Sequence, residues 1–200
     1  YRGIAYIILE DQSSGNFPDW YQALGWGYVA GIPIMLLVFA VFAVLYGLLL
    51  HKTTFGRSVY AIGNNITASR FSGLKVDKIK VVVFTLAGFM SAVTALFLTS
   101  RMGSTRPNVA TNYEIDAIAM VVLGGVSASG GRGRIIGTII SIFLVGLLRY
   151  GLGLVNVNAQ IMLIVIGLLL VFAVMISNLQ VKRSGLQYKN MKVQKAENEN

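Results

Sequence analysis

The chain has 200 residues, of which 55% are hydrophobic and only 12% are charged, and its formal net charge is +9. A soluble domain carries about 25% charged residues, so this composition excludes an ordinary soluble domain. The chain has no cysteine and one histidine. Disulfides, thiol catalysis and a metal cluster built on these residues are therefore excluded, and we expect no catalytic site, no bound metal and no cofactor in this chain.

Three uncharged stretches, residues 20–50, 81–100 and 150–181, are each long enough to cross a bilayer. A helix rises about 1.5 Å per residue, so roughly 20 residues cross a hydrocarbon core of about 30 Å. Lipid offers no hydrogen-bond partners to the backbone, which favours helices. The sequence predicts an all-α, polytopic transmembrane helical bundle over residues 1–180. The polar tail 181–200 is predicted to be disordered.

Residues 3–9 form a short apolar run directly after Arg2. The run is too short for a signal peptide and lacks a small-residue cleavage site. We expect it to be the end of an earlier membrane helix, and the chain to be the C-terminal part of a longer protein. On this interpretation the chain holds about four full or partial spans plus a truncated one.

The positive charge gathers in the segments that flank the spans. Segment 51–80 contains six basic residues and one acidic residue, and more basic residues follow in the tail. Lys and Arg accumulate in short cytoplasmic loops, so we expect 51–80 and the C-terminus inside the cell and residues 11–26 outside. The charge therefore indicates topology and no nucleic-acid partner.

Residues 101–157 must then contribute either no crossing or two. Residues 117–125 form a short apolar run, and residues 135–148, between two arginines, would span only about 21 Å as a helix. Extending the second run to residue 154 would place Arg149 near the outer interface. We expect an irregular or broken helix here, close to a solute path, because such backbone is tolerated in a membrane only where protein or a cavity covers it.

Helix-end signals mark several boundaries. Asn64 or Asn65 is expected to cap a short helix that Gly73 closes, and Asp77 is expected to cap the next span. Thr111 and Glu114 have the spacing of a capping box.

The first candidate functional segment is the inner loop from residue 54 to 74. Its small residues, flanked by glycine, suit a helix that docks in a groove of another protein. The alternative is a solvated, positively charged interfacial helix.

The second candidate is the glycine-rich stretch 124–134, which lacks the lysine and the preceding strand of a phosphate-binding loop. Five glycines suit either a flexible turn or a tightly packed functional one. The nearby Glu114 and Asp116 are the only carboxylates in the middle of the chain, and they either cap the helix that they begin or serve solute passage or proton coupling. His51 is expected to lie at an interface.

Two separate motifs carry a family resemblance. The first is Gly56-Arg57-Ser58-Val59-Tyr60-Ala61-Ile62-Gly63-Asn64 with Ala68 and residues 72–77. The second is Tyr113-Glu114-Ile115-Asp116-Ala117-Ile118-Ala119, running into residues 122–125 and 130–133. Over about residues 55–180 the chain resembles the permease subunits of ABC importers for simple sugars, the ribose/xylose type.

The resemblance implies a bacterial inner-membrane permease with a cytoplasmic C-terminus. Two permease subunits would pair, separate ATPase subunits would bind and hydrolyse ATP, and an external binding protein would deliver the sugar. The implied ATPase-coupling residues are Asn64, Asn65, Ala68, Ser69, Arg70, Ser72 and Gly73. The implied translocation-path residues are Tyr113, Glu114, Asp116, Gly124, Gly125, Ser127, Gly130 and Gly131.

Three alternatives stay open. Permeases for branched-chain amino acids share the general pattern but differ in the Gly-Asn stretch at 63–64, and permeases for the autoinducer-2 furanose resemble the sugar type closely. An ion-coupled secondary transporter would need charge pairs at mid-bilayer, and the three uncharged stretches hold none.

Overall fold

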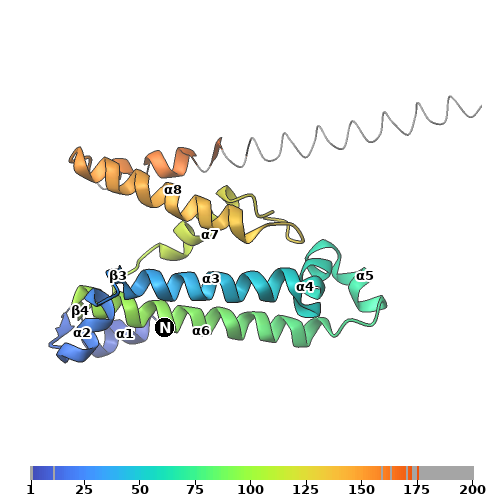
Figure 1. The fold of residues 1–200 in the computed structure, drawn as a ribbon, viewed down its shortest axis with the longest axis horizontal. Coiled ribbons are helices and arrows are strands. Elements are labelled where there is room, and N and C mark those ends of the chain that lie inside the picture. The colour runs from blue at the N-terminus through green and yellow to red at the C-terminus, as the bar shows by residue number, and fades with distance from the viewer. Residues whose placement is uncertain are drawn as a thin grey trace, which may run out of the picture. The chain divides into compact units, whose positions relative to one another are not determined.

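The computed structural model describes residues 2–10, 12–158, 160–162, 164–169, 171, 172 and 175. The chain consists of two compact units, Tyr1–Tyr113 and Glu114–Asn200 (Figure 1). Helices dominate the described residues, and the strands among them are only two residues long. The predicted all-α fold is confirmed.

The first unit contains most of the elements. In chain order they are α1 (Arg2–Leu9), β1 (Ser14–Gly15), α2 (Asp19–Trp26), β2 (Tyr28–Val29), β3 (Ile32–Pro33), α3 (Ile34–Lys52), α4 (Thr54–Asn64), α5 (Ile66–Phe71), α6 (Val76–Met102) and β4 (Ser104–Thr105).

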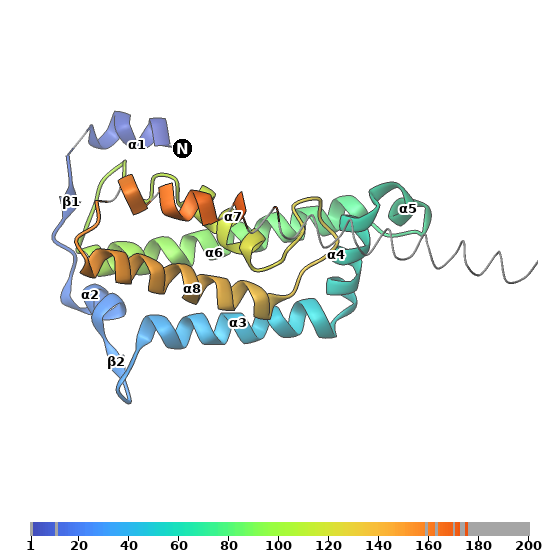
Figure 2. The same cartoon turned by 90° about the horizontal axis from the view of Figure 1, so that it is seen from above.

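The long helices α3 and α6 run alongside each other in opposite directions (Figures 1 and 2). The rings of Phe42 and Phe89 meet between them with centroids 6.1 Å apart. At one end, α4 and α5 connect the two helices, and at the other end lie α2 and the two strand pairs. The inner loop and the segment before α3 are therefore at opposite ends of this unit.

The uncharged stretch 20–50 is not a single helix. It divides into α2, a β2–β3 hairpin and α3, with Tyr28 opposite Pro33 in the hairpin. Ala30 and Gly31 form the turn with φ of 53° and 79°. Two consecutive positive φ angles are typical of a tight hairpin turn. Pro33 then directly precedes α3, where its missing N–H costs least.

The second unit contains α7 (Tyr113–Leu123), which begins at the boundary residue, and α8 (Ile135–Leu154). Residues 160–162 and 164–169 are also helical. In the part of the chain that the structure describes, α3, α6 and α8 are long and apolar enough to cross a membrane. Of the uncharged stretch 150–181, residues 150–154 belong to α8, and several of the later residues lie outside the described ones, as does the whole tail 181–200.

The apolar side chains of the long helices remain largely exposed within this chain. Val41 and Val44 on α3 are 57% and 61% exposed, and Phe84 on α6 is 75% exposed. Exposed apolar surface of this extent is rare on soluble proteins. It suits helices whose surroundings are lipid or further membrane helices.

Candidate functional site

The inner loop begins with a tight reversal between α3 and α4. The Thr53 hydroxyl donates to the Leu49 carbonyl (2.6 Å) and accepts from the Gly56 amide (3.2 Å). A Cβ at Gly56 would lie 2.0 Å from the carbonyl oxygen of Leu50. Glycine therefore allows α4 to fold back onto the end of α3.

The short helix α5 has the ends that its sequence predicts. Asn65 caps it by accepting from the Ala68 amide (2.9 Å), which decides between Asn64 and Asn65. At its other end Gly73 has a φ of 80°, and the Leu74 amide donates to the Ser69 carbonyl (3.1 Å). A left-handed glycine after the last turn is a common way to end a helix.

Most of the predicted coupling residues lie on the surface of the loop. Ser69 does not, because only 5% of it is exposed. The exposed members are Asn64, Asn65, Ala68, Arg70, Ser72 and Gly73. A docking surface on this loop would therefore be built without the Ser69 side chain.

Asp77 does not have the predicted capping role. The helix α6 begins at Val76, and the Asp77 carboxylate instead accepts from the Arg70 guanidinium (3.1 Å), with side chains 82% and 59% exposed. An exposed pair contributes about 0–1 kcal/mol. Its effect is to connect the end of α5 with the first turn of α6.

Phe71, which is not among the predicted coupling residues, is the most exposed large hydrophobic residue of the described loop. It is 90% exposed at the last position of α5, and Ile66 at the first position is 45% exposed. Aromatic side chains are typical anchors of protein interfaces. The sequence already shows this aromatic residue directly after Arg70, in a loop that is otherwise basic and polar around it.

The predicted capping box before α7 is wrong. The Thr111 hydroxyl donates to the Asn108 carbonyl (2.7 Å), and α7 begins only at Tyr113. Asn112 has a φ of 68°, which an N-cap does not adopt. Glu114 and Asp116 still lie in the first turn of α7, where the helix dipole favours carboxylates.

The end of α7 and the start of α8 approach each other at two glycines. A Cβ at Gly124 would lie 2.6 Å from the Cα of Thr138, and a Cβ at Gly137 would lie 2.1 Å from the carbonyl oxygen of Gly124. The backbones touch here with no room for a side chain. Small residues permit this kind of packing between membrane helices.

One helical turn away from these glycines, earlier in α7 and later in α8, a buried serine joins the two helices. Ser141 is 2% exposed and donates to the Met120 carbonyl (2.5 Å) and the Thr138 carbonyl (2.8 Å). Because Met120 precedes Gly124 by four residues and Ser141 follows Gly137 by four, the two helices are antiparallel. They form a helical hairpin.

An ion pair joins the hairpin at its open end. The Arg149 guanidinium donates to the Asp116 carboxylate (2.6 Å), and the side chains are 35% and 19% exposed. The sequence predicted a position for Arg149 near the outer interface, but it did not predict that Asp116 would be its partner. Both residues continue the same four-residue spacing, Asp116 before Met120 and Arg149 after Val145, so the register that the Gly124–Gly137 contact sets brings them together.

The glycine-rich turn between α7 and α8 is ordered by its own hydrogen bonds. The Ser127 amide donates to the Arg132 carbonyl (2.9 Å), and the Ser127 and Ser129 hydroxyls are 2.8 Å apart. Gly125, Gly130 and Gly131 have φ of 83°, 88° and 74°. These contacts favour the packed turn over the flexible one.

The predicted path residues therefore fall into three places. Asp116 and Gly124 lie at the α7–α8 contact, Glu114 is exposed on the first turn of α7, and Tyr113 is 50% exposed. The remaining four, Gly125, Ser127, Gly130 and Gly131, form the turn.

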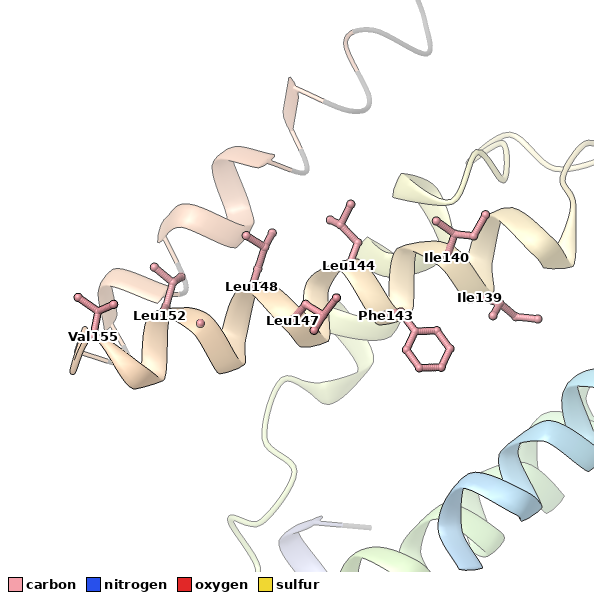
Figure 3. A pocket seen from close by; sticks show the side chains of 9 residues that line it. Ile139, Ile140, Phe143, Leu144, Leu147, Leu148, Leu152 and Val155 are labelled. Carbon is pink, nitrogen blue, oxygen red and sulfur yellow. The ribbon is translucent and has the colours of Figure 1, made fainter. Parts of the chain in front are cut away.

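A shallow apolar groove of about 770 Å³ runs along α8 (Figure 3). Its lining is Ile139, Ile140, Phe143, Leu144, Leu147, Leu148, Gly151, Leu152 and Val155. A sugar needs several hydrogen-bonding groups, which these side chains do not supply. The lining of the groove therefore does not suit a sugar. Among the described residues, no group of three or more His, Cys, Asp or Glu side chains could hold a metal.

Three span-length apolar helices and a helical hairpin closed by small residues define a polytopic helical membrane protein. Comparison with known proteins refines this class. A family described as the permease component of branched-chain amino acid transport systems matches residues 3–174. The chain belongs to this permease family.

Several relatives are named as sugar permeases. The chain is 46% identical over 178 residues to the ribose import permease protein RbsC of Bacillus subtilis, covering 88% of this chain and 55% of that protein. It is 39% identical to the RbsC protein of Haemophilus influenzae (88% of this chain, 56% of that protein). It is 38% identical to the L-arabinose transport system permease protein AraH of Escherichia coli (86% and 53%).

The chain thus spans about half the length of the relatives that it matches. No solved structure matches it. The resemblance to sugar-type permeases that the two motifs predicted is confirmed.

Proposed function

We propose that this chain belongs to the membrane-spanning permease subunit of an ABC importer and helps to form the path of a simple sugar. The carrying observation is the identity of 38–46% to permeases named for ribose and L-arabinose, over most of the chain. An external binding protein delivers the sugar, and separate ATPase subunits drive the transport. The permease acts in the bacterial cell membrane as one of a pair.

The substrate we propose is a pentose or a similar sugar. Ribose and L-arabinose occur in the names of the relatives, whereas the family description refers to branched-chain amino acids. Uptake of labelled ribose by proteoliposomes that hold the full-length permease, its ATPase and its binding protein tests this. We expect uptake that requires ATP and the binding protein, and that unlabelled pentoses reduce.

Other outcomes of this experiment would contradict the proposal. Competition by leucine or by the autoinducer-2 furanose, with none by pentoses, would point to one of the alternative solutes. Uptake that an ion gradient drives in the absence of the ATPase would reject the ABC importer.

We assign ATPase coupling to the loop 51–80 and centre it on α5. This short helix is capped at both ends. Its exposed residues include Ala68, Arg70 and the caps Asn65 and Ser72, and Phe71 at its last position is 90% exposed. A short helix with hydrogen-bonded ends can pass a movement of the ATPase on to the neighbouring span, because few of its backbone torsion angles are free to change instead. The interfacial-helix alternative would leave ATPase binding unchanged when α5 is altered.

We assign the α7–α8 hairpin to the solute path. The helix α7 has 11 residues, so it rises about 16 Å and cannot cross a core of about 30 Å by itself. Its irregular continuation through the glycine turn requires cover by protein or a water-filled cavity. The carboxylates of Glu114 and Asp116 are then near solute, with Asp116 neutralised by Arg149.

The proposed topology places the inner loop and the C-terminus in the cytoplasm. The basic excess of segment 51–80 supports this assignment. The position of α5 and α2 at opposite ends of the first unit agrees with residues 11–26 being outside.

A further inference from the structure

Helix α2 packs closely on the last turns of α6. Ser100, with 0% exposure, donates to the Tyr21 carbonyl (2.5 Å), and the Tyr21 hydroxyl lies 2.5 Å from that of Thr99. A Cβ at Gly25 would lie 2.6 Å from the Arg101 amide nitrogen. These contacts use the face of α2 that Tyr21 and Gly25 share, at a spacing of four residues.

The rest of α2 and the following hairpin present aromatic and apolar side chains outward. Trp20 is 70% exposed, Trp26 60%, Tyr28 68% and Val29 53%. The Trp26 ring N–H is already satisfied, because it donates to the Arg101 carbonyl (3.0 Å). The exposed part of the ring therefore has no free hydrogen-bond donor to offer to water.

This patch lies level with the end of the spans. The Ile34 amide, at the start of α3, donates to the Gly27 carbonyl (3.0 Å), and the Arg101 guanidinium reaches the Met35 sulfur (3.9 Å). The 19 residues of α3 rise about 28 Å, which matches a hydrocarbon core. Trp26 thus lies at the boundary where that core ends.

Two features of the exposed aromatic patch indicate that lipid covers it: the arginines beside it, and the exposed apolar side chains that connect it with α3. The Arg101 guanidinium lies 4.7 Å from the centroid of the Trp26 ring, and Arg101 and Arg106 are both exposed, as suits contact with lipid phosphates. Ile32 and Leu36, 42% and 45% exposed, continue the patch onto the span surface of α3. Trp and Tyr favour the level of the lipid headgroups, where an apolar ring and a polar group are both satisfied.

We propose that α2 and the β2–β3 hairpin form an interfacial anchor, with Trp20 and Trp26 seated among the lipid headgroups of one leaflet. The anchor determines how deeply α6 sits in the bilayer, because α2 packs directly on the last turns of α6. This inference depends only on the chain being a membrane protein, so it stands or fails independently of sugar transport.

The chain allows a direct test, because Trp20 and Trp26 are its only tryptophans. The full-length permease is reconstituted in phospholipid vesicles, with any tryptophan outside this chain replaced by phenylalanine. Trp20→Phe leaves only Trp26, and Trp26→Phe leaves only Trp20. Emission is recorded with phospholipids brominated near the headgroup or near the chain ends, and with aqueous iodide.

We expect a greater loss of emission with bromine near the headgroup than with bromine near the chain ends, and little loss with iodide. The matched control is Phe89→Trp in the chain without Trp20 and Trp26. Phe89 lies midway along α6 and is 54% exposed. Its emission should respond most to bromine near the chain ends.

Strong quenching by iodide with none by either lipid would overturn the anchor. Protection from both quenchers by an added binding protein would instead make the patch a protein-docking surface and also reject the proposal. Since Trp26→Phe removes a hydrogen bond, the chain with both tryptophans is measured as well, and its quenching pattern should match those of the two single-tryptophan variants.

Discussion

At the scale of single residues, the α7–α8 contact depends on small and charged side chains at four-residue spacing. Gly124 and Gly137 let the backbones touch, Ser141 satisfies a carbonyl, and Asp116 meets Arg149. Lipid gives apolar helices no hydrophobic reason to associate, so close packing and polar contacts must supply the attraction. Changes at these positions should therefore have larger effects than changes on the exposed faces.

Replacing Asp116 with alanine should destabilise the protein by up to about 3 kcal/mol, because Arg149 would lose its partner in a poorly solvated place. The thermal midpoint of the purified permease measures the effect. Glu114→Ala, in the same turn but exposed, is the matched control and should change it little. Exchanging the two residues, Asp116→Arg with Arg149→Asp, should restore stability, and a double variant as unstable as the single one would contradict the pair's role.

Gly124→Ala should weaken the hairpin by about 1–3 kcal/mol, since its Cβ would collide with the backbone of Thr138. Gly146→Ala, in α8, has open space around its Cβ and should be neutral or stabilising. The thermal midpoint and sugar uptake should both fall for the first variant only. Equal behaviour of the two variants would disprove close approach at Gly124. Gly125, next in the chain, has open space for a Cβ and is needed for its φ of 83° instead.

At the scale of elements, α5 is a six-residue helix that cannot be stable alone. The cap by Asn65, the left-handed Gly73 and the burial of Ser69 and Val76 hold it in place. These contacts leave its outer surface free for a partner.

Phe71→Ala should weaken binding of the ATPase about tenfold, the loss of about 1.4 kcal/mol that an interface anchor contributes. Phe71 is almost fully exposed within the chain, so membrane insertion and thermal stability should not change. ATPase retained on the purified permease is the measurement, and Thr67→Ala, exposed on the same helix, is the control. Full retention by the Phe71 variant would remove Phe71 from the interface.

At the scale of the whole molecule, the proposed topology assigns opposite sides of the membrane to the two ends of the first unit. This chain has no cysteine, so once any cysteine outside it is replaced by serine, a single introduced cysteine reports its own position. Thr67 and Ser13 are both exposed and lie on the inner loop and on the segment before α2.

In intact cells, a membrane-impermeant thiol reagent should label Ser13→Cys but not Thr67→Cys. In inverted vesicles the pattern should reverse, because the basic loop 51–80 stays on the cytoplasmic side. Labelling of Thr67→Cys from outside would invert the topology and exclude ATPase coupling at α5.

Much of this protein is determined locally. The long apolar runs, the charge asymmetry and the ends of α5 each depend on neighbouring residues. The sequence alone therefore predicts the helical membrane fold, the inner loop, and a short helix that begins at Asn64 or Asn65 and closes at Gly73, and the structure selects Asn65. The two family motifs likewise lead to the permease family that the comparisons show.

Only the tertiary structure decided which distant residues meet. Asp116 and Arg149 are 33 positions apart, and Tyr21 lies against Ser100 79 positions away. Asp77 pairs with Arg70 although its position suited a cap, and the stretch 20–50 divides into a helix, a hairpin and a span. Local pattern determines helices because their hydrogen bonds join near neighbours, whereas contacts between helices depend on how the chain folds back on itself.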